Sequence, residues 1–128
     1  MHNSDAPLIS ILMNCYNGER YLHDAIKSVI KQTYLNWELI FWDNQSTDNS
    51  KAIFESYQDN RFKYYYASEH TDLGGARANA FKYLCGDYIA ILDTDDVWLP
   101  DKLEKQIQLF SNADIGIVIS DTLFFNDT

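Results

Sequence analysis

Short apolar runs alternate with segments of helical periodicity along the whole chain, and this alternation restricts the fold more than any other feature. The five apolar runs read LISILMNCY, WELIFWD, RFKYYYA, YIAILD and IGIVIS, and the last of them covers Ile115–Ser120. A chain that alternates strand and helix forms a mostly parallel sheet, because each crossover returns the next strand in the same direction. We therefore predict an α/β, Rossmann-like fold with helices on both faces of the sheet. The third run carries charges, which favours a position nearer an edge.

The segments between the runs predict four helices. In the first, apolar residues recur at helical spacing and should form its inner face. These residues are Leu22, Ala25, Ile26, Val29 and Ile30. For the second helix we predict Ser46 or Thr47 as the N-cap and an end near Tyr57. The third is entered through Gly74 and Gly75. Pro100 is predicted in the first turn of the fourth helix.

Bulk composition excludes several classes of protein. The 128 residues suit one domain, and a net charge of −9 argues against binding nucleic acid, which requires a basic face. The two cysteines, Cys15 and Cys85, form no CxxC pair, so a reducing compartment is expected. No signal peptide and no apolar stretch long enough to span a bilayer is found in the sequence. We expect a cytoplasmic protein.

Polar clusters follow three of the predicted strands. They are Asn14–Asn17, Asp43–Ser46 and Asp93–Asp96. Ligands of open parallel sheets bind at the carboxyl ends of the strands. The sequence therefore predicts one binding site built from these three loops.

The last cluster holds three carboxylates in four positions, Asp93, Asp95 and Asp96. A hard divalent cation such as Mg²⁺ or Mn²⁺ relieves their repulsion and can grip a diphosphate. The simpler alternative is a solvated loop that caps the helix near Pro100. An EF-hand is rejected, because Val97 and Trp98 occupy positions that should hold a ligand and a glycine.

Haloacid-dehalogenase-type phosphatases also place a D-x-D after an apolar strand, with the first aspartate as nucleophile. The sequence ILDTDDVW is similar to that pattern. In those enzymes the motif usually lies near the start of the domain and continues D-G-T, whereas Asp96 is followed here by Val97 and Trp98. A phosphatase that uses Asp93 is kept as an alternative, as is a non-catalytic nucleotide-binding module.

Taken together, the segments resemble the family 2 glycosyltransferases of the GT-A fold. The resemblance extends from about Leu8 to Ser120 and rests on the order of three pieces. They read ISILMNCYNGERYLHDAIKSVIKQTYLNWELIFWDNQSTDNS, LGGARANA and GDYIAILDTDDVWLPDKL. It implies transfer of a sugar from a nucleotide-diphosphate donor to an acceptor hydroxyl, with inversion and with Mg²⁺ or Mn²⁺. The expected setting is polysaccharide or glycan synthesis.

The resemblance also implies roles for individual residues. Tyr16 would stack on the nucleobase, Asp43 would accept a hydrogen bond from it, and Arg77 would approach the base or the diphosphate. Asn14 stands where the family often has Pro or Thr, so backbone contacts are expected from it. The acidic cluster would complete the donor site: Asp93 supports the metal shell, Asp95 binds ribose or metal, and Asp96 lies close to the metal.

Each of these residues also has a simpler explanation. Tyr16 could pack at a strand end, Asp43 could cap the next helix, and Arg77 could pair with Glu69. His70 is a lone loop histidine, for which a catalytic role is not favoured. Gly74 and Gly75 most simply permit a turn.

The resemblance places the general base of inverting members downstream, so we expect it beyond Thr128. Residues 1–128 would then be a single domain, the donor-binding part of a longer enzyme that ends before the acceptor segment. A UDP-sugar is the favoured donor, and a glycan or lipid-linked molecule the expected acceptor. A full-length protein of this kind would associate peripherally with the inner face of the membrane.

Overall fold

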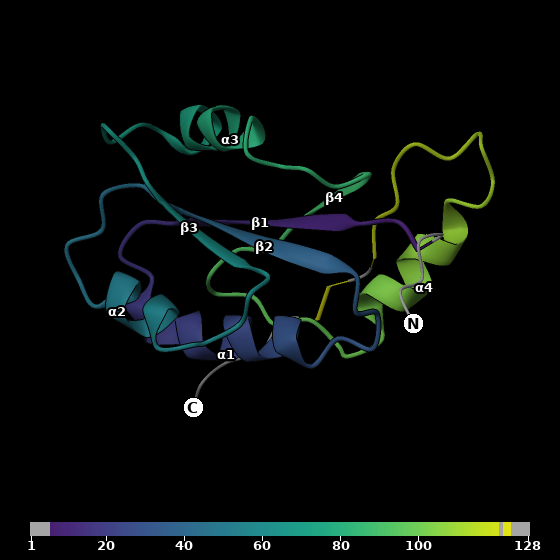
Figure 1. The fold of residues 1–128 in the computed structure, drawn as a ribbon, viewed down its shortest axis with the longest axis horizontal. Coiled ribbons are helices and arrows are strands. Elements are labelled where there is room, and N and C mark those ends of the chain that lie inside the picture. The colour runs from purple at the N-terminus through teal and green to yellow at the C-terminus, as the bar shows by residue number, and fades with distance from the viewer. Residues whose placement is uncertain (1–5, 121, 124–128) are drawn as a thin grey trace.

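The computed structural model describes residues 6–120 and 122–123, and its elements alternate as the sequence predicts (Figure 1). In chain order they are β1 (Ile9–Cys15), α1 (Glu19–Ile30), β2 (Trp37–Asp43), α2 (Ser50–Glu55), β3 (Phe62–Tyr66), α3 (Leu73–Phe81), β4 (Tyr88–Ile91) and α4 (Lys102–Leu109). The strands form one sheet in the order β3-β2-β1-β4, and all three pairings are parallel. The predicted α/β class is confirmed, and β3 is an edge strand as its charges indicated.

The two central strands run level with each other. Ile9 pairs with Trp37 at one end, and Cys15 pairs with Asp43 at the other. On the far side of β1, Leu12 pairs with Ile91 of β4. The carboxyl ends of β1, β2 and β4 therefore meet at one edge of the sheet, which is where the three polar clusters were predicted to converge.

Helices cover both faces of the sheet (Figure 1). α3 lies on one side, and α1, α2 and α4 lie on the other. Four of the five apolar residues predicted for the inner face of α1 are fully buried, whereas Ile30 remains 39% exposed at the end of the helix. On the opposite face, Ala76 and Ala80 of α3 pack against Leu12 and Ile40. Their small side chains bring α3 close to the sheet.

The start of α2 differs from the prediction. Its N-cap is Asn49, and neither Ser46 nor Thr47 begins the helix. Instead, the Ser46 backbone N–H donates to Asp43, and the Thr47 N–H donates to Asn17. Both residues are therefore held in the loop after β2, and the helix is shorter than predicted, ending at Glu55 rather than near Tyr57.

The fifth strand predicted at Ile115–Ser120 is wrong for this structure. The segment has no strand conformation, and Ile117 and Ile119 are 83% and 87% exposed. An apolar sequence favours a strand, but a strand also needs a neighbouring backbone to bond with. Among the described residues, β4 pairs only with β1, so its outer edge is open.

Two smaller points complete the fold. α4 begins at Lys102, and the predicted first-turn residue Pro100 lies in the turn just before it. In the described part of the chain, no helix is long and apolar enough to cross a bilayer.

Candidate functional site

The loops after β1, β2 and β4 are in contact with one another. A Cβ built on Gly18, in the first loop, would lie 2.8 Å from Oγ1 of Thr94 in the third. The Gly18 N–H donates to Oγ of Ser50 at 3.0 Å, which ties the first loop to the start of α2. Only a residue without a side chain allows the first and third loops to approach this closely.

The third loop presents the acidic cluster. One carboxylate oxygen from each of Asp93, Asp95 and Asp96 lies within 4.8 Å of the others, and all three residues are exposed. Partial burial raises the pKa of Asp96, and the charges of Asp95 and then Asp93 raise it further. These oxygens are close enough to share one cation and are of the kind that Mg²⁺ and Mn²⁺ prefer.

Arg77 on α3 faces this cluster. Its Nη2 lies 3.6 Å from Oδ1 of Asp93, so the pairing with Glu69 that the sequence left open is not the one found. The helix that carries Arg77 is capped by Asp72, whose Oδ1 accepts from the Gly75 N–H at 2.7 Å. The Nε atom of Arg77 is buried and has no hydrogen-bond partner among the described residues. The guanidinium thus keeps donor capacity for an anion.

Asn14 lies on the same face of the sheet. It pairs with Trp42 of β2 and lies two residues beyond Leu12, whose partner Ile91 lies two residues before Asp93. Both side-chain atoms of its amide are buried and without a partner in the part of the chain that is described. Buried polar groups in native proteins are rarely left unpaired, so the amide marks a place for a ligand group or a water. The sequence predicted only backbone contacts here and did not identify the amide.

Asp43 is more deeply placed than the sequence suggested. It is 1% exposed, its Oδ1 accepts from the Ser46 N–H at 2.8 Å, and its Oδ2 accepts from the Tyr64 hydroxyl at 2.5 Å. Burial and, to a smaller extent, the hydrogen bond to Asp43 raise the pKa of Tyr64 far above its ordinary value. Asp43 does not cap α2; it holds the loop after β2, and each of its oxygens keeps one further lone pair.

Tyr16 remains open to solvent at the end of β1. Its side chain is 54% exposed, and its ring lies 4.5 Å from the ring of His70, tilted by 58°. The Nδ1 atom of His70 is 3.0 Å from the backbone oxygen of Asn44. An exposed aromatic face is therefore bordered by an imidazole from the loop after β3, which sequence reasoning did not assign to the site.

Backbone strain is found in the loop after β1 and in the loop after β2. Asn17, after β1, has φ 52°, and Gln45, after β2, has φ 67°. Asparagine tolerates this left-handed conformation better than glutamine does. Residues held in sparsely populated conformations cluster at binding sites, and here both lie beside Tyr16 and Asp43.

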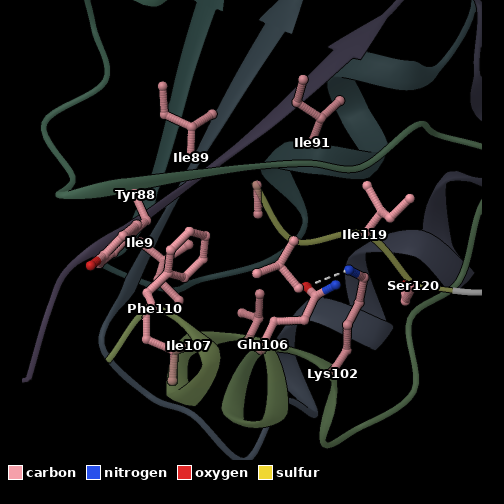
Figure 2. Close-up of a pocket in the computed structure, with 13 residues that line it drawn as sticks. Ile9, Tyr88, Ile89, Ile91, Lys102, Gln106, Ile107, Phe110, Ile119 and Ser120 are labelled. Atoms are coloured by element: carbon pink, nitrogen blue, oxygen red, sulfur yellow. Dashed lines mark hydrogen bonds between the residues drawn. The ribbon is translucent and has the colours of Figure 1, made fainter. Parts of the chain in front are cut away.

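A separate hollow of the described surface lies away from these residues. It measures about 430 Å³ and is lined by β4, α4 and residues 118–120. Figure 2 shows Lys102 and Gln106 of α4 facing this hollow and joined by a hydrogen bond of 2.7 Å, whereas Ile89 and Ile91 project from the other side of β4. None of the residues predicted for the site lines it.

Known proteins resemble the chain in both sequence and fold. The profile of the family described as Glycosyl transferase family 2 matches residues 10–128. The *Escherichia coli* enzyme named UDP-Glc:alpha-D-GlcNAc-diphosphoundecaprenol beta-1,3-glucosyltransferase WfgD is 38% identical over 96% of this chain and 49% of its own length. An uncharacterized glycosyltransferase of *Haemophilus influenzae* is 43% identical over 79% of this chain and 41% of its own.

Two solved structures extend the comparison. *Staphylococcus aureus* TarS residues 1–349, solved in complex with UDP-GlcNAc, has a TM-score of 0.75 and 25% identity over 80% of this chain and 31% of its own. The mannosyltransferase PcManGT from *Pyrobaculum calidifontis*, solved with GDP-Man and Mn²⁺, has a TM-score of 0.81 at 19% identity, covering 88% of this chain and 35% of its own, and shows a shared fold.

The sequence profile and the fold agree with each other. The chain spans about half the length of the curated relatives it matches. The profile covers nearly all of it, and its parallel sheet matches those of the GT-A structures. The chain belongs to glycosyl transferase family 2.

Proposed function

We propose that this chain forms the donor-binding part of an inverting, metal-dependent glycosyltransferase that transfers a sugar from a nucleotide diphosphate to an acceptor hydroxyl. The observation that carries the proposal is the joining of the acidic cluster to the Tyr16 loop through the Gly18–Thr94 contact. An aromatic face for a base and carboxylates for a diphosphate-bound cation then lie at one edge of the sheet.

The residues of the acidic cluster fit a divalent cation by their chemistry and spacing. Asp95 and Asp96 would hold Mg²⁺ or Mn²⁺, while Asp93, paired with Arg77, supports them. The bound cation offsets the negative charge that builds on the departing diphosphate. Magnesium keeps open coordination positions for phosphate oxygens, which suits an exposed cluster with few protein ligands.

The remaining residues bind and orient the donor. Tyr16 stacks on the base, and Asp43 accepts from it through a lone pair that Ser46 and Tyr64 leave open. Arg77 and the amide of Asn14 supply donors for the diphosphate, which would satisfy the unpaired buried Nε of Arg77 and Nδ2 of Asn14. Asp95 also reaches the ribose.

The general base of the proposed reaction is not assigned within the described residues. We place it on a segment beyond Thr128, together with the acceptor site. Residues 1–128 would then bind the donor without completing the transfer.

The names of the relatives suggest the substrates. WfgD is named for UDP-Glc and a lipid-linked acceptor, and TarS was solved with UDP-GlcNAc. We propose a UDP-sugar as donor and a glycan or lipid-linked acceptor in polysaccharide synthesis, at the cytoplasmic face of the membrane. The phosphatase alternative is not favoured, because the family profile covers nearly the whole chain and Asp93 is paired with Arg77.

Thermal denaturation with UDP and Mn²⁺ tests this site. A ligand that binds only the folded state at 100 times its Kd stabilises it by about 2.7 kcal/mol, on the order of 10 °C for a domain of this size. Replacing Asp95 and Asp96 by Ala should abolish the rise. The matched control replaces Asp24 and Asp114, two exposed aspartates outside the cluster, and should keep it. A full shift in the Asp95→Ala, Asp96→Ala protein would refute the site.

A further inference from the structure

We propose that His70 recognises the nucleoside of the donor, its Nε2 atom accepting a hydrogen bond from it. The proposal rests on the function proposed above and adds a residue to it. Its basis is the contact between the exposed ring of Tyr16 and the exposed ring of His70, whose centroids are 4.5 Å apart. A base that stacks on Tyr16 lies beside this imidazole.

The fold fixes which nitrogen of His70 is available. Nδ1 lies 3.0 Å from the Asn44 backbone oxygen, and a carbonyl oxygen can only accept a hydrogen bond. The neutral imidazole therefore carries its proton on Nδ1, which leaves the lone pair of Nε2 free as an acceptor.

The loop that holds His70 is anchored at the next residue. The Asn44 side chain donates from Nδ2 to the Thr71 carbonyl at 2.7 Å, and its Oδ1 accepts from the Thr71 N–H at 3.1 Å. Two reciprocal hydrogen bonds thus tie this loop to the end of β2. Such anchoring reduces the entropy that His70 would lose on contacting a ligand.

Other polar side chains near Tyr16 are already engaged. Asp43 is 1% exposed and accepts one hydrogen bond from the protein at each oxygen, which leaves one further lone pair on each for the base. Oδ1 of Asn17 accepts from Thr47, and Oγ of Ser46 accepts from the Asn17 N–H. His70 differs from them in being exposed and in keeping an acceptor without a partner among the described contacts.

An acceptor at this position selects a donor group on the ligand. In a uridine nucleotide the candidates are the ribose hydroxyls and the N3–H of the base, which is also the group that Asp43 would accept from. N3-methyl-UDP removes the N3–H, and 2′-deoxy-UDP removes a hydroxyl. Comparing the two analogues identifies the group that Nε2 contacts.

Titration calorimetry with UDP and Mn²⁺ on three proteins provides the test. His70→Asn keeps an amide near the Nδ1 position but removes Nε2, so binding should weaken about fivefold, the effect of one hydrogen bond. His70→Gln places an amide oxygen near the Nε2 position and should recover most of the loss. Relative to UDP, the analogue that lacks the contacted group should lose about fivefold more affinity for wild-type protein than for His70→Asn.

Two controls separate a nucleoside contact from damage to the loop. Pyrophosphate with Mn²⁺ should bind wild-type and His70→Asn proteins equally. His23→Asn alters a second histidine–tyrosine pair, in which Nδ1 of His23 lies 2.8 Å from the hydroxyl of Tyr57, and should leave UDP affinity unchanged.

The outcomes distinguish failure of the role proposed for His70 from failure of the function proposed for the chain. Unchanged UDP affinity in His70→Asn would overturn the role of His70 alone, as would an equal loss of pyrophosphate binding. Failure of wild-type protein to bind UDP at all would overturn the proposed function and this inference with it.

Discussion

At the scale of single residues, Gly18 is the position where the site leaves least room. A Cβ there would meet Oγ1 of Thr94 at 2.8 Å, Cβ of Thr94 at 3.0 Å and Sγ of Cys15 at 3.2 Å. All three atoms belong to short side chains beside the candidate site. Adding a single methyl group at Gly18 therefore tests whether the loops after β1 and β4 pack as described.

Gly18→Ala should destabilise the chain by about 1–3 kcal/mol, because Thr94 or the loop backbone must move aside. The matched control is Gly74→Ala in α3, where the nearest atom to a new Cβ is 3.8 Å away and alanine favours the helix. Urea denaturation measures both variants. Equal stability of the two would show that the loops are not in contact at Gly18.

The roles of some site residues could be predicted from the sequence, whereas those of others could not. Asp93, Asp95 and Asp96 adjoin one another in the chain, so their proximity follows from the sequence. Asn14 was expected to offer only its backbone, and His70 was set aside, because their significance depends on neighbours distant in sequence. An unpaired buried amide and an imidazole beside Tyr16 are properties of the folded chain.

At the scale of elements, Glu38 joins the strands at the end of the sheet opposite the candidate site. Its side chain is 6% exposed and accepts from Ser10 Oγ at 2.6 Å, from Lys63 Nζ at 2.7 Å and from the Cys85 N–H at 2.8 Å. β1, β2, β3 and the approach to β4 thus share one carboxylate. Burial alone would raise the pKa of Glu38, but the hydrogen bonds from Lys63, Ser10 and Cys85 outweigh it and lower the pKa below 4.5.

This network predicts a pH dependence of stability. A lowered pKa in the folded state means that the carboxylate stabilises the fold above pH 4.5 and that this contribution is lost as the pH falls below it. Glu38→Gln should reduce the free energy of unfolding by about 2 kcal/mol at pH 7, since charged hydrogen bonds are lost. The difference from wild type should shrink at pH 3.5.

Urea denaturation at the two pH values measures the effect. The control is Glu55→Gln, whose exposed pair with Lys51 spans 4.0 Å and should contribute less than about 0.5 kcal/mol. A difference between wild type and Glu38→Gln that stays constant from pH 7 to pH 3.5 would contradict the assignment.

The elements show where pattern reasoning succeeds and where it fails. β1 and β2 were predictable because an apolar run buried on both faces has few other solutions. The N-cap of α2 was not, because Ser46 and Thr47 bond with Asp43 and Asn17 instead. The strand predicted at Ile115–Ser120 failed because apolar content does not supply a pairing partner.

At the scale of the whole molecule, the sheet has two open edges, one along β3 and one along β4. Among the described residues, β3 pairs only with β2 and β4 pairs only with β1. Ile89 and Ile91 on β4 are 47% and 46% exposed. Apolar surface beside an open sheet edge favours association between chains.

We expect the 128-residue chain to self-associate as its concentration rises. Ile89→Lys should shift sedimentation toward the monomer, because a charge at an edge strand opposes pairing. Leu35→Lys adds the same charge at a residue that is 69% exposed in the loop before β2, and should change the distribution little. An identical response of both variants would show that the β4 edge is not involved.

The contact between Gly18 and Thr94 has a thermodynamic consequence for the proposed site. It joins the loop after β1, which begins at Tyr16, to the loop after β4, which holds the acidic cluster. Ordering either loop therefore also orders the other. Reciprocity of coupled equilibria then requires that a cation which tightens nucleotide binding by some factor be bound more tightly by that same factor when nucleotide is present.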